Sequence, residues 1–194
     1  GGTATNPGDQ IATIPLAAGG TAPDNDFTEV RGSISGHVFV DAGDNGTYDA
    51  LFDPPLGDID VTLTGTDVLG NIITPITIQT QADGSYSVRT VAPISYTIPI
   101  DGPIGEFFRR TNMSHMRPAH IHFAVSAPGY HYLVTHLFQK GDEYIDNDVV
   151  YGVKDALIVE FVKRPPGKAP NGEMVGTPFY EVHYDFVLEQ KQAA

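Results

Sequence analysis

The chain has 194 residues and a formal net charge of −13, with 21 glycines, 15 prolines and no cysteine. The lack of cysteine excludes disulfides, zinc–thiolate sites and thiol catalysis, and the negative charge argues against a nucleic-acid partner. No stretch approaches the roughly 20 apolar residues that a membrane helix needs, and the opening GGTATNPGDQ lacks the features of a signal peptide.

Residues 1–30 are rich in Gly, Ala, Thr, Pro and Asn, a composition typical of an extended arm or linker. From residue 31 onward, apolar and polar residues alternate as they do in strands with one buried face. Turn residues separate these segments, and the acidic stretch DAGDNGTYDALFDPP is expected to be a loop. The strands predicted before residue 91 are GSISGHVFVD, IDVTLTGTD, IITPITIQT and SYSVRTV, with Pro75 indicating an edge or a bulge in the third.

The stretch APISYTIPIDGPIGEFFRRTNMSHM, residues 92–116, is too rich in Pro and Gly to predict regular structure. Loops of this length in a compact domain usually carry function. No helix longer than two turns is predicted anywhere, so the pattern indicates an all-β sandwich or barrel. The later predicted strands are RPAHIHFAVSAPG, YLVTHLFQKGD, ALIVEFVKR and FYEVHYDFVLE.

The segment RPAHIHF, residues 117–123, places His120 and His122 two positions apart. Side chains alternate along a strand, so both histidines point the same way, about 7 Å apart along the chain. Two converging neutral imidazoles supply half of a metal site. The alternative is that both are half-exposed residues on a polar strand face, while Ile121 and Phe123 form the apolar face.

The remaining ligands have to come from other segments. The nearest carboxylates, Glu106 and Asp142, fall in predicted turns, which disfavours a site of two histidines and one carboxylate. Tyr96 stands in the long loop between Pro93 and Pro99, where a core tyrosine would be hard to place. A phenolate is a hard anionic ligand that suits Fe(III), and such a site performs oxygen chemistry on phenols.

Four segments of the second half of the chain carry a family resemblance: VAPISYTIPIDGPIG, RPAHIHFAVSAPGY, YLVTHLFQKGDEYIDNDVVYGVKDALIVEF and NGEMVGTPFYEVHYDFVLE. Over about residues 84–189 they resemble the intradiol ring-cleaving dioxygenases, and are most similar to the hydroxyquinol (1,2,4-trihydroxybenzene) 1,2-dioxygenases. The resemblance implies a prealbumin-like β-sandwich with long active-site loops and one Fe(III) held by two tyrosines and two histidines.

The resemblance also implies roles for individual residues. Tyr96 would be the ligand that the substrate displaces, and His120 and His122 the histidine ligands. Arg117 would lie beside the substrate and stabilise charge on its ring. His136 stands where catechol-cleaving relatives usually have Gln and the hydroxyquinol branch has His, which implies hydroxyquinol as the substrate.

Residues 30–90 are instead similar to a B-type repeat of serine–aspartate repeat surface proteins. The similarity rests on GSISGHVFVDAGDNGTYDALFDPPLGDIDVTLTGTDVLGN and the later ADGSYSV. Both families share the sandwich, so we interpret residues 31–194 as a composite of a surface-repeat-like half, 31–90, and a catalytic half, 91–194, joined near 84–93. The helical dimerisation region with which these dioxygenases normally begin is not seen, which leaves the oligomeric state open.

The fourth iron ligand is the point where the resemblance is incomplete. When the strands are aligned in order, the earlier tyrosine of the family falls on Ile72, which cannot bind iron. The segment DNGTYDAL offers Tyr48 as a substitute. Tyr48 is therefore either a ligand or a packed or surface tyrosine of the loop.

The acidic loop offers a chemistry of its own. Closely spaced oxygen ligands around Gly46 are typical of calcium loops, although a solvated acidic turn explains the same residues. The candidate calcium ligands are Asp41, Asp44, Asn45, Asp49 and Asp53.

Two functional hypotheses follow. The first is a cytosolic Fe(III) intradiol dioxygenase, with one iron per chain, that cleaves hydroxyquinol or a related catechol with O2 to a muconate-type or maleylacetate-type product. The second is a non-enzymatic, calcium-binding sandwich module of a bacterial surface protein.

Overall fold

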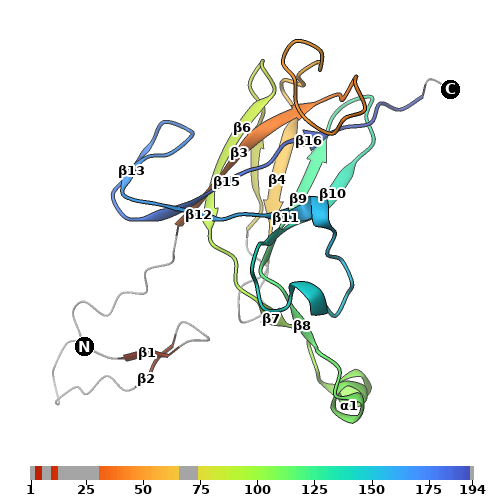
Figure 1. The fold of residues 1–194 in the computed structure, drawn as a ribbon, viewed down its shortest axis with the longest axis vertical. Coiled ribbons are helices and arrows are strands. Elements are labelled where there is room, and N and C mark those ends of the chain that lie inside the picture. Colours follow the sequence, from red (N-terminus) through yellow and green to blue (C-terminus); the bar gives the residue numbers. More distant parts are fainter. Residues whose placement is uncertain (1–2, 6–9, 13–30, 66–73, 193–194) are drawn as a thin grey trace. The chain divides into compact units, whose positions relative to one another are not determined.

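The computed structural model describes residues 3–5, 10–12, 31–65 and 74–192, and the chain divides into two compact units, 1–30 and 31–194. In the first unit, strand β1 (Thr3–Thr5) pairs antiparallel with β2 (Gln10–Ala12). The second unit contains two five-stranded sheets (Figure 1). Among the described residues, no helix is both long and apolar enough to span a membrane.

The first sheet is antiparallel except at one edge, where β11 runs parallel to β10. Its β5 edge begins one residue after Pro75 and confirms the predicted edge position. The predicted strand started earlier, but residues 66–73 lie outside the described part of the chain. In spatial order the strands are β11 (Ile158–Val159), β10 (Leu133–Gln139), β9 (His120–Ser126), β4 (Asp60–Thr64) and β5 (Ile76–Gln79).

The second sheet is built around β3, which pairs antiparallel with β6 on one edge and parallel with β15 and β16 on the other. Strand β12 pairs with the outer edge of β15. The predicted final strand FYEVHYDFVLE is thus divided into two short strands. The bounds are β3 (Arg31–Phe39), β6 (Ser85–Val91), β12 (Val162–Arg164), β15 (Phe179–His183) and β16 (Phe186–Val187).

One apolar core lies between the sheets, which confirms the predicted all-β sandwich. Alternate residues of each strand point into it, as the pleat requires. Because β4 pairs with β9, and β3 with both β6 and β15, the strands before and after residue 90 interleave. The largest fully buried members of this core are Phe123, Phe186, Ile34, Leu137, Leu188, Val38, Val61 and Val125.

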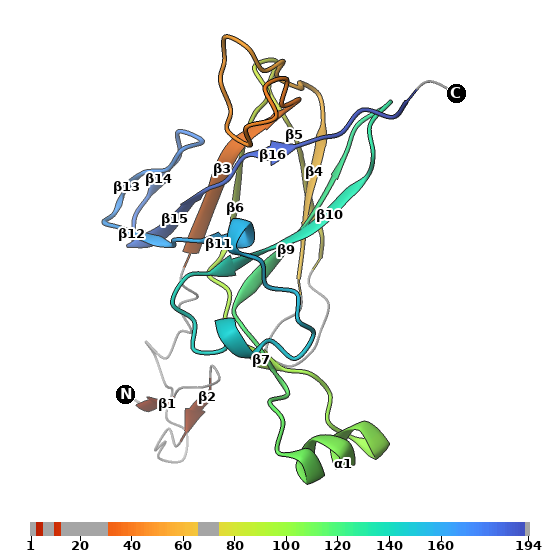
Figure 2. The same ribbon diagram turned by 45° about the vertical axis from the view of Figure 1, so that its right-hand side comes forward.

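The prediction that residues 92–116 contain no regular structure is wrong, because helix α1 (Gly102–Thr111) lies in their middle. Pro103 falls in the first turn, where its missing N–H costs nothing, and Asn112 ends the helix in the left-handed conformation. Figure 2 shows α1 projecting beyond β7, the short strand that pairs with β8.

The remaining elements of the second unit are short strands and two 3-10 helices, which lie in the segments between the longer strands. The segment ALIVEFVKR, predicted as one strand, begins within the 3-10 helix η2 and continues into the short strands β11 and β12. The bounds of those not yet given are β7 (Tyr96–Thr97), β8 (Met116–Arg117), η1 (Ile145–Asn147), η2 (Asp155–Leu157), β13 (Gly167–Lys168) and β14 (Met174–Val175).

Candidate active site

The two histidines of RPAHIHF lie on the outer face of the first sheet. Along β9, Ile121 and Phe123 point into the core, so His120 and His122 point away from it. His136 on β10 stands directly opposite His122, with the ring centroids 4.2 Å apart. Adjacent strands therefore bring three imidazoles together.

The ring nitrogens of His120 and His122 are arranged as two ligands of one cation would be. Nδ1 of His120 donates to the carbonyl oxygen of Pro118 at 2.6 Å, which places the ring proton on Nδ1 and makes Nε2 the acceptor atom of the ring. In this structure that atom accepts a hydrogen bond from Arg117 Nη1, which a bound metal ion would replace. The Nε2 atoms of His120 and His122 are 3.1 Å apart. Two nitrogens that bind a metal ion at about 2.1 Å and at a right angle are about 3.0 Å apart.

Burial keeps these imidazoles neutral. It lowers the pKa of His120 to about 4, with a smaller contribution from the positive charge of Arg117. Burial, together with the neighbouring His136 and His120 rings, lowers the pKa of His122 to about 4. Burial and the Arg117 charge also lower the pKa of His136. At neutral pH all three are in the form that accepts a metal ion or a hydrogen bond.

Tyr96 reaches the same cluster from the neighbouring ladder. It pairs with Arg117 between β7 and β8, and its ring centroid lies 5.5 Å from that of His120. The Arg117 Nη1 lies 3.4 Å from the Tyr96 Oη and 3.0 Å from the His120 Nε2. The structure thus brings together Tyr96, Arg117, His120, His122 and His136, all of which the sequence singled out.

Asp148 belongs to the site but was missed from the sequence. Its Oδ1 accepts a hydrogen bond from Arg117 Nε at 3.2 Å, and its Oδ2 accepts the Gly152 N–H at 2.9 Å. Both partners of this ion pair are buried, at 6% exposure for Arg117 and 4% for Asp148. Burial raises the pKa of Asp148, but the hydrogen bonds and the Arg117 charge outweigh it, so this pKa lies below its ordinary value.

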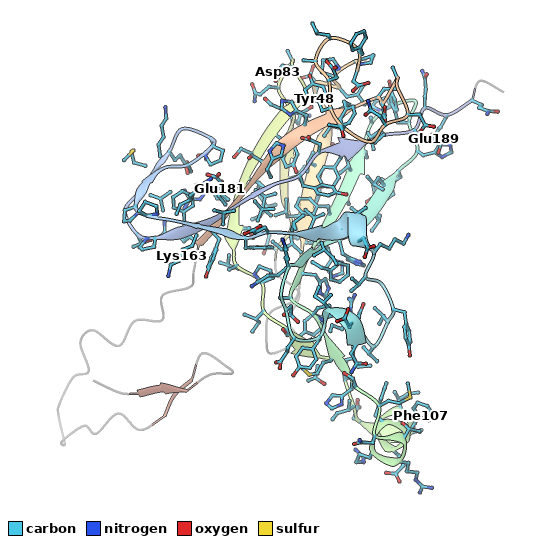
Figure 3. The ribbon with its side chains drawn as sticks, in the orientation of Figure 1. Tyr48, Asp83, Phe107, Lys163, Glu181 and Glu189 are labelled. Carbon is cyan, nitrogen blue, oxygen red and sulfur yellow. The ribbon has the colours of Figure 1, made fainter. Side chains whose placement is uncertain are left out.

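Tyr48, predicted as an alternative ligand, lies elsewhere. Its ring stacks on His37 with centroids 4.4 Å apart and contacts Phe39 at 5.1 Å. Figure 3 shows Tyr48 at one end of the sandwich. In the same orientation, Figure 1 shows β7 and β8 at the opposite end. The ligand interpretation of Tyr48 is therefore wrong, and the packed alternative holds. Ile72 lies outside the described residues.

The calcium interpretation of the acidic loop is also not supported. Asp41 accepts the backbone N–H groups of Asn45 and Gly46, while Asp53 accepts those of Ala42 and Asp49. These carboxylates are occupied in fixing the loop conformation, which is why they are closely spaced.

The other three candidates add no calcium site. Asp49 accepts the N–H of Leu51, and the Asn45 side-chain oxygen accepts the N–H of Thr47 at 2.8 Å. Asp44 is exposed with φ of 51°. In the described part of the chain, no three His, Cys, Asp or Glu side chains form a group that could hold a metal ion.

A family model described as Dioxygenase matches residues 41–190. A hydroxyquinol 1,2-dioxygenase of Nocardioides simplex is 38% identical over 149 residues, which cover 76% of this chain and 46% of that protein. A hydroxyquinol 1,2-dioxygenase of Rhodococcus opacus is 44% identical over 114 residues, which cover 57% of this chain and 38% of that protein. This chain therefore spans less than half the length of these relatives.

Two solved structures share the fold. Hydroxyquinol 1,2-dioxygenase from Pseudomonas putida DLL-E4 superposes with a TM-score of 0.74 and 31% identity, covering 85% of this chain and 58% of that one. Catechol 1,2-dioxygenase from Pseudomonas arvilla C-1 gives 0.71 and 28%, covering 88% and 55%. The family match includes the junction proposed near residues 84–93, so a composite with a surface repeat gains no support.

Proposed function

Because this chain belongs to the intradiol ring-cleavage dioxygenases, we propose that it opens the ring of hydroxyquinol or a related catechol with O2. The bond broken joins the two carbons that carry the substrate hydroxyls. Both oxygen atoms enter the product, a maleylacetate-type or muconate-type diacid, so the reaction balances without an external reductant. The names of the relatives support the substrate class.

One Fe(III) per chain is the cofactor that the site fits. The observation that carries this proposal is the separation of 3.1 Å between the Nε2 atoms of His120 and His122, with the His120 ring fixed by Pro118. Tyr96 would add an anionic oxygen ligand, which Fe(III) prefers. When bound, the ion supplies Lewis acidity that lowers the pKa of the substrate hydroxyls.

The side chains of the site would then orient the substrate and move its protons. Tyr96 Oη is the atom that accepts a proton from the substrate diol, acting as a general base. The Arg117 guanidinium, held by Asp148, has its Nη2 buried and without a hydrogen-bond partner in the described residues. This group would donate to the negative charge that develops on the substrate.

The test of this function is a visible absorption spectrum of the Fe(III)-loaded protein, before and after anaerobic addition of 1,2,4-trihydroxybenzene. We expect a tyrosinate-to-iron charge-transfer band that shifts with substrate, and O2 uptake once air is admitted. In His120→Ala both should be lost, while His183→Ala, in an exposed strand position, should retain both. Ring cleavage that survives His120→Ala would refute the proposal.

His136 is the residue to which we assign the preference for the triol. Its neutral imidazole stands beside His122 and can hydrogen-bond the third hydroxyl of hydroxyquinol. One hydrogen bond corresponds to about a tenfold change in specificity. His136→Phe, which removes the hydrogen-bonding atoms, should therefore lower kcat/KM for hydroxyquinol relative to catechol by about tenfold, whereas His131→Phe should leave the ratio unchanged. An unchanged ratio in His136→Phe would remove His136 from substrate selection.

A further inference from the structure

Asp142 follows the end of β10, where the sequence suggests only a turn. Its Oδ2 accepts the hydroxyl of Ser95 and also the backbone N–H of Ala119, at 3.1 Å. Its Oδ1 accepts the N–H of Tyr144 at 2.9 Å, which fixes the carboxylate within its own turn. One carboxylate thus connects two segments that are distant in sequence.

Those two segments carry candidate metal ligands. Ser95 immediately precedes Tyr96, and Ala119 immediately precedes His120. We propose that Asp142 is a positioning residue that holds Tyr96 and His120 at a fixed separation. The inference rests on the proposed function, because the separation of Tyr96 and His120 matters only if both bind iron. The hydrogen bonds of Asp142 are observed independently of that function.

The Tyr96 segment is the side that needs this support. Strand β7 has only two residues, and none of residues 91–101 is fully buried. Apolar packing therefore contributes little to fixing its position, and polar contacts have to do so. The Ser95 hydroxyl bond to Asp142 is such a contact, immediately next to the phenol that must face the histidines.

The Ala119 segment is the rigid side. Ala119 is 3% exposed, and its carbonyl oxygen accepts the N–H of Gln139 at 2.9 Å. His120 then continues the ladder opposite Phe138. The Asp142 carboxylate is thus anchored to the sheet, and through Ser95 it fixes the loop segment relative to the sheet.

Ser95→Ala tests this role, because it removes the hydroxyl and leaves the turn intact. The first measurement is retention of Fe(III) against a competing chelator, followed by the tyrosinate charge-transfer band. Loss of a group that orients a metal ligand typically lowers metal affinity by about 10-fold or more. We expect that loss in Ser95→Ala and in Asp142→Asn, and recovery in Ser95→Thr, which keeps the hydroxyl. Asp146→Asn, an exposed carboxylate of the same loop, is the matched control.

The second measurement is hydrogen exchange of residues 94–98 in the metal-free protein. It should be faster in Ser95→Ala than in the parent or in Asp146→Asn. If the parent binds no iron, the proposed function fails, and hydrogen exchange alone decides whether Asp142 holds this segment. If the parent binds iron and Ser95→Ala retains it equally, the positioning role is overturned, whether or not exchange changes. Should Asp142→Asn fail to fold, Ser95→Ala still decides.

Discussion

An imidazole binds a cation only in its neutral form, and burial keeps His120 and His122 neutral in the metal-free protein. Their pKa values of about 4 lie below the value of about 6.5 for an imidazole in an unfolded chain. Between these two values the unfolded state binds more protons than the folded state. The free energy of unfolding therefore falls as the pH falls through this window, and is constant above it.

The metal-free protein should lose stability on acidification from about pH 7 to about pH 5, by up to about 2 kcal/mol for each of these two imidazoles. Urea unfolding at the two pH values measures this. The pKa of Asp148 is lowered, so its stabilisation is lost only below about pH 4 and does not contribute here. The double variant His120→Asn/His122→Asn should show a smaller pH dependence; an equal dependence would mean that these imidazoles do not titrate as described.

The buried ion pair of Arg117 and Asp148 leads to a second prediction, which concerns the free energy of unfolding. Removal of one partner of a buried pair leaves the other charge uncompensated, which costs about 3 kcal/mol. Asp148→Asn keeps the shape of the side chain and should lower the free energy of unfolding by about that amount. Denaturant titration measures it, with Glu160→Gln as control, because the Lys140–Glu160 pair is exposed. Equal stability of the two variants would contradict the role given to Asp148.

The clustering of Tyr96, His120 and His122 could be predicted from the sequence, whereas the place of Asp148 could not. The local spacing of His120 and His122 on one strand indicates that they share a face, and the position of Tyr96 in a proline-rich loop singles it out. Asp148 joins Arg117 across 31 positions, through a loop whose path depends on η1 and on left-handed Tyr151. No local pattern encodes such a pairing.

At the scale of elements, α1 shows why counting glycine and proline misleads. Gly102 and Pro103 open the helix and Asn112 closes it, so the residues that suggested irregular structure are its boundaries. Gly105, inside the helix, has to be glycine, because a Cβ at this position would collide with the carbonyl oxygen of Ile100. Composition alone does not predict this helix, because the same glycine and proline residues form helix ends or loops depending on their position.

In the second sheet, position 36 on β3 also has to be glycine. The chain passes from β15 to β16 through Tyr184, whose carbonyl oxygen would lie 1.8 Å from a Cβ at position 36. That oxygen accepts the hydroxyl of Tyr86 at 2.7 Å, so it cannot move without cost. Gly36→Ala should therefore lower the free energy of unfolding by about 3 kcal/mol.

Thermal or urea unfolding of Gly36→Ala checks this. Gly176→Ala is the control, since nothing lies within 4 Å of a Cβ at that position. If both variants unfold like the parent, the close approach of the two strands is not a constraint on the fold.

At the scale of the second unit, the sequence predicted the sandwich correctly but not its connectivity. Alternation identifies a strand and its buried face, and it does so for β3, β6 and β9. It carries no information about which strand lies beside which, because pairing depends on contacts between distant segments. The interpretation as two joined halves rested on the similarity of residues 30–90 to a surface repeat, and alternation alone could not test it, because it does not show which strands pair.

The interleaved strands predict that neither half is a folding unit. Residues 31–92 contain β3 and β4 but lack β15, β16 and β9, the partners that complete both sheets and the core. A fragment of residues 31–92 would expose Ile34, Val38 and Val61 to water, and so should lack cooperative unfolding. Circular dichroism during urea titration tests this against residues 31–192, which should unfold in one transition. A cooperative transition in the shorter fragment would mean that the first half is an independent domain, contrary to the interleaved pairing of its strands.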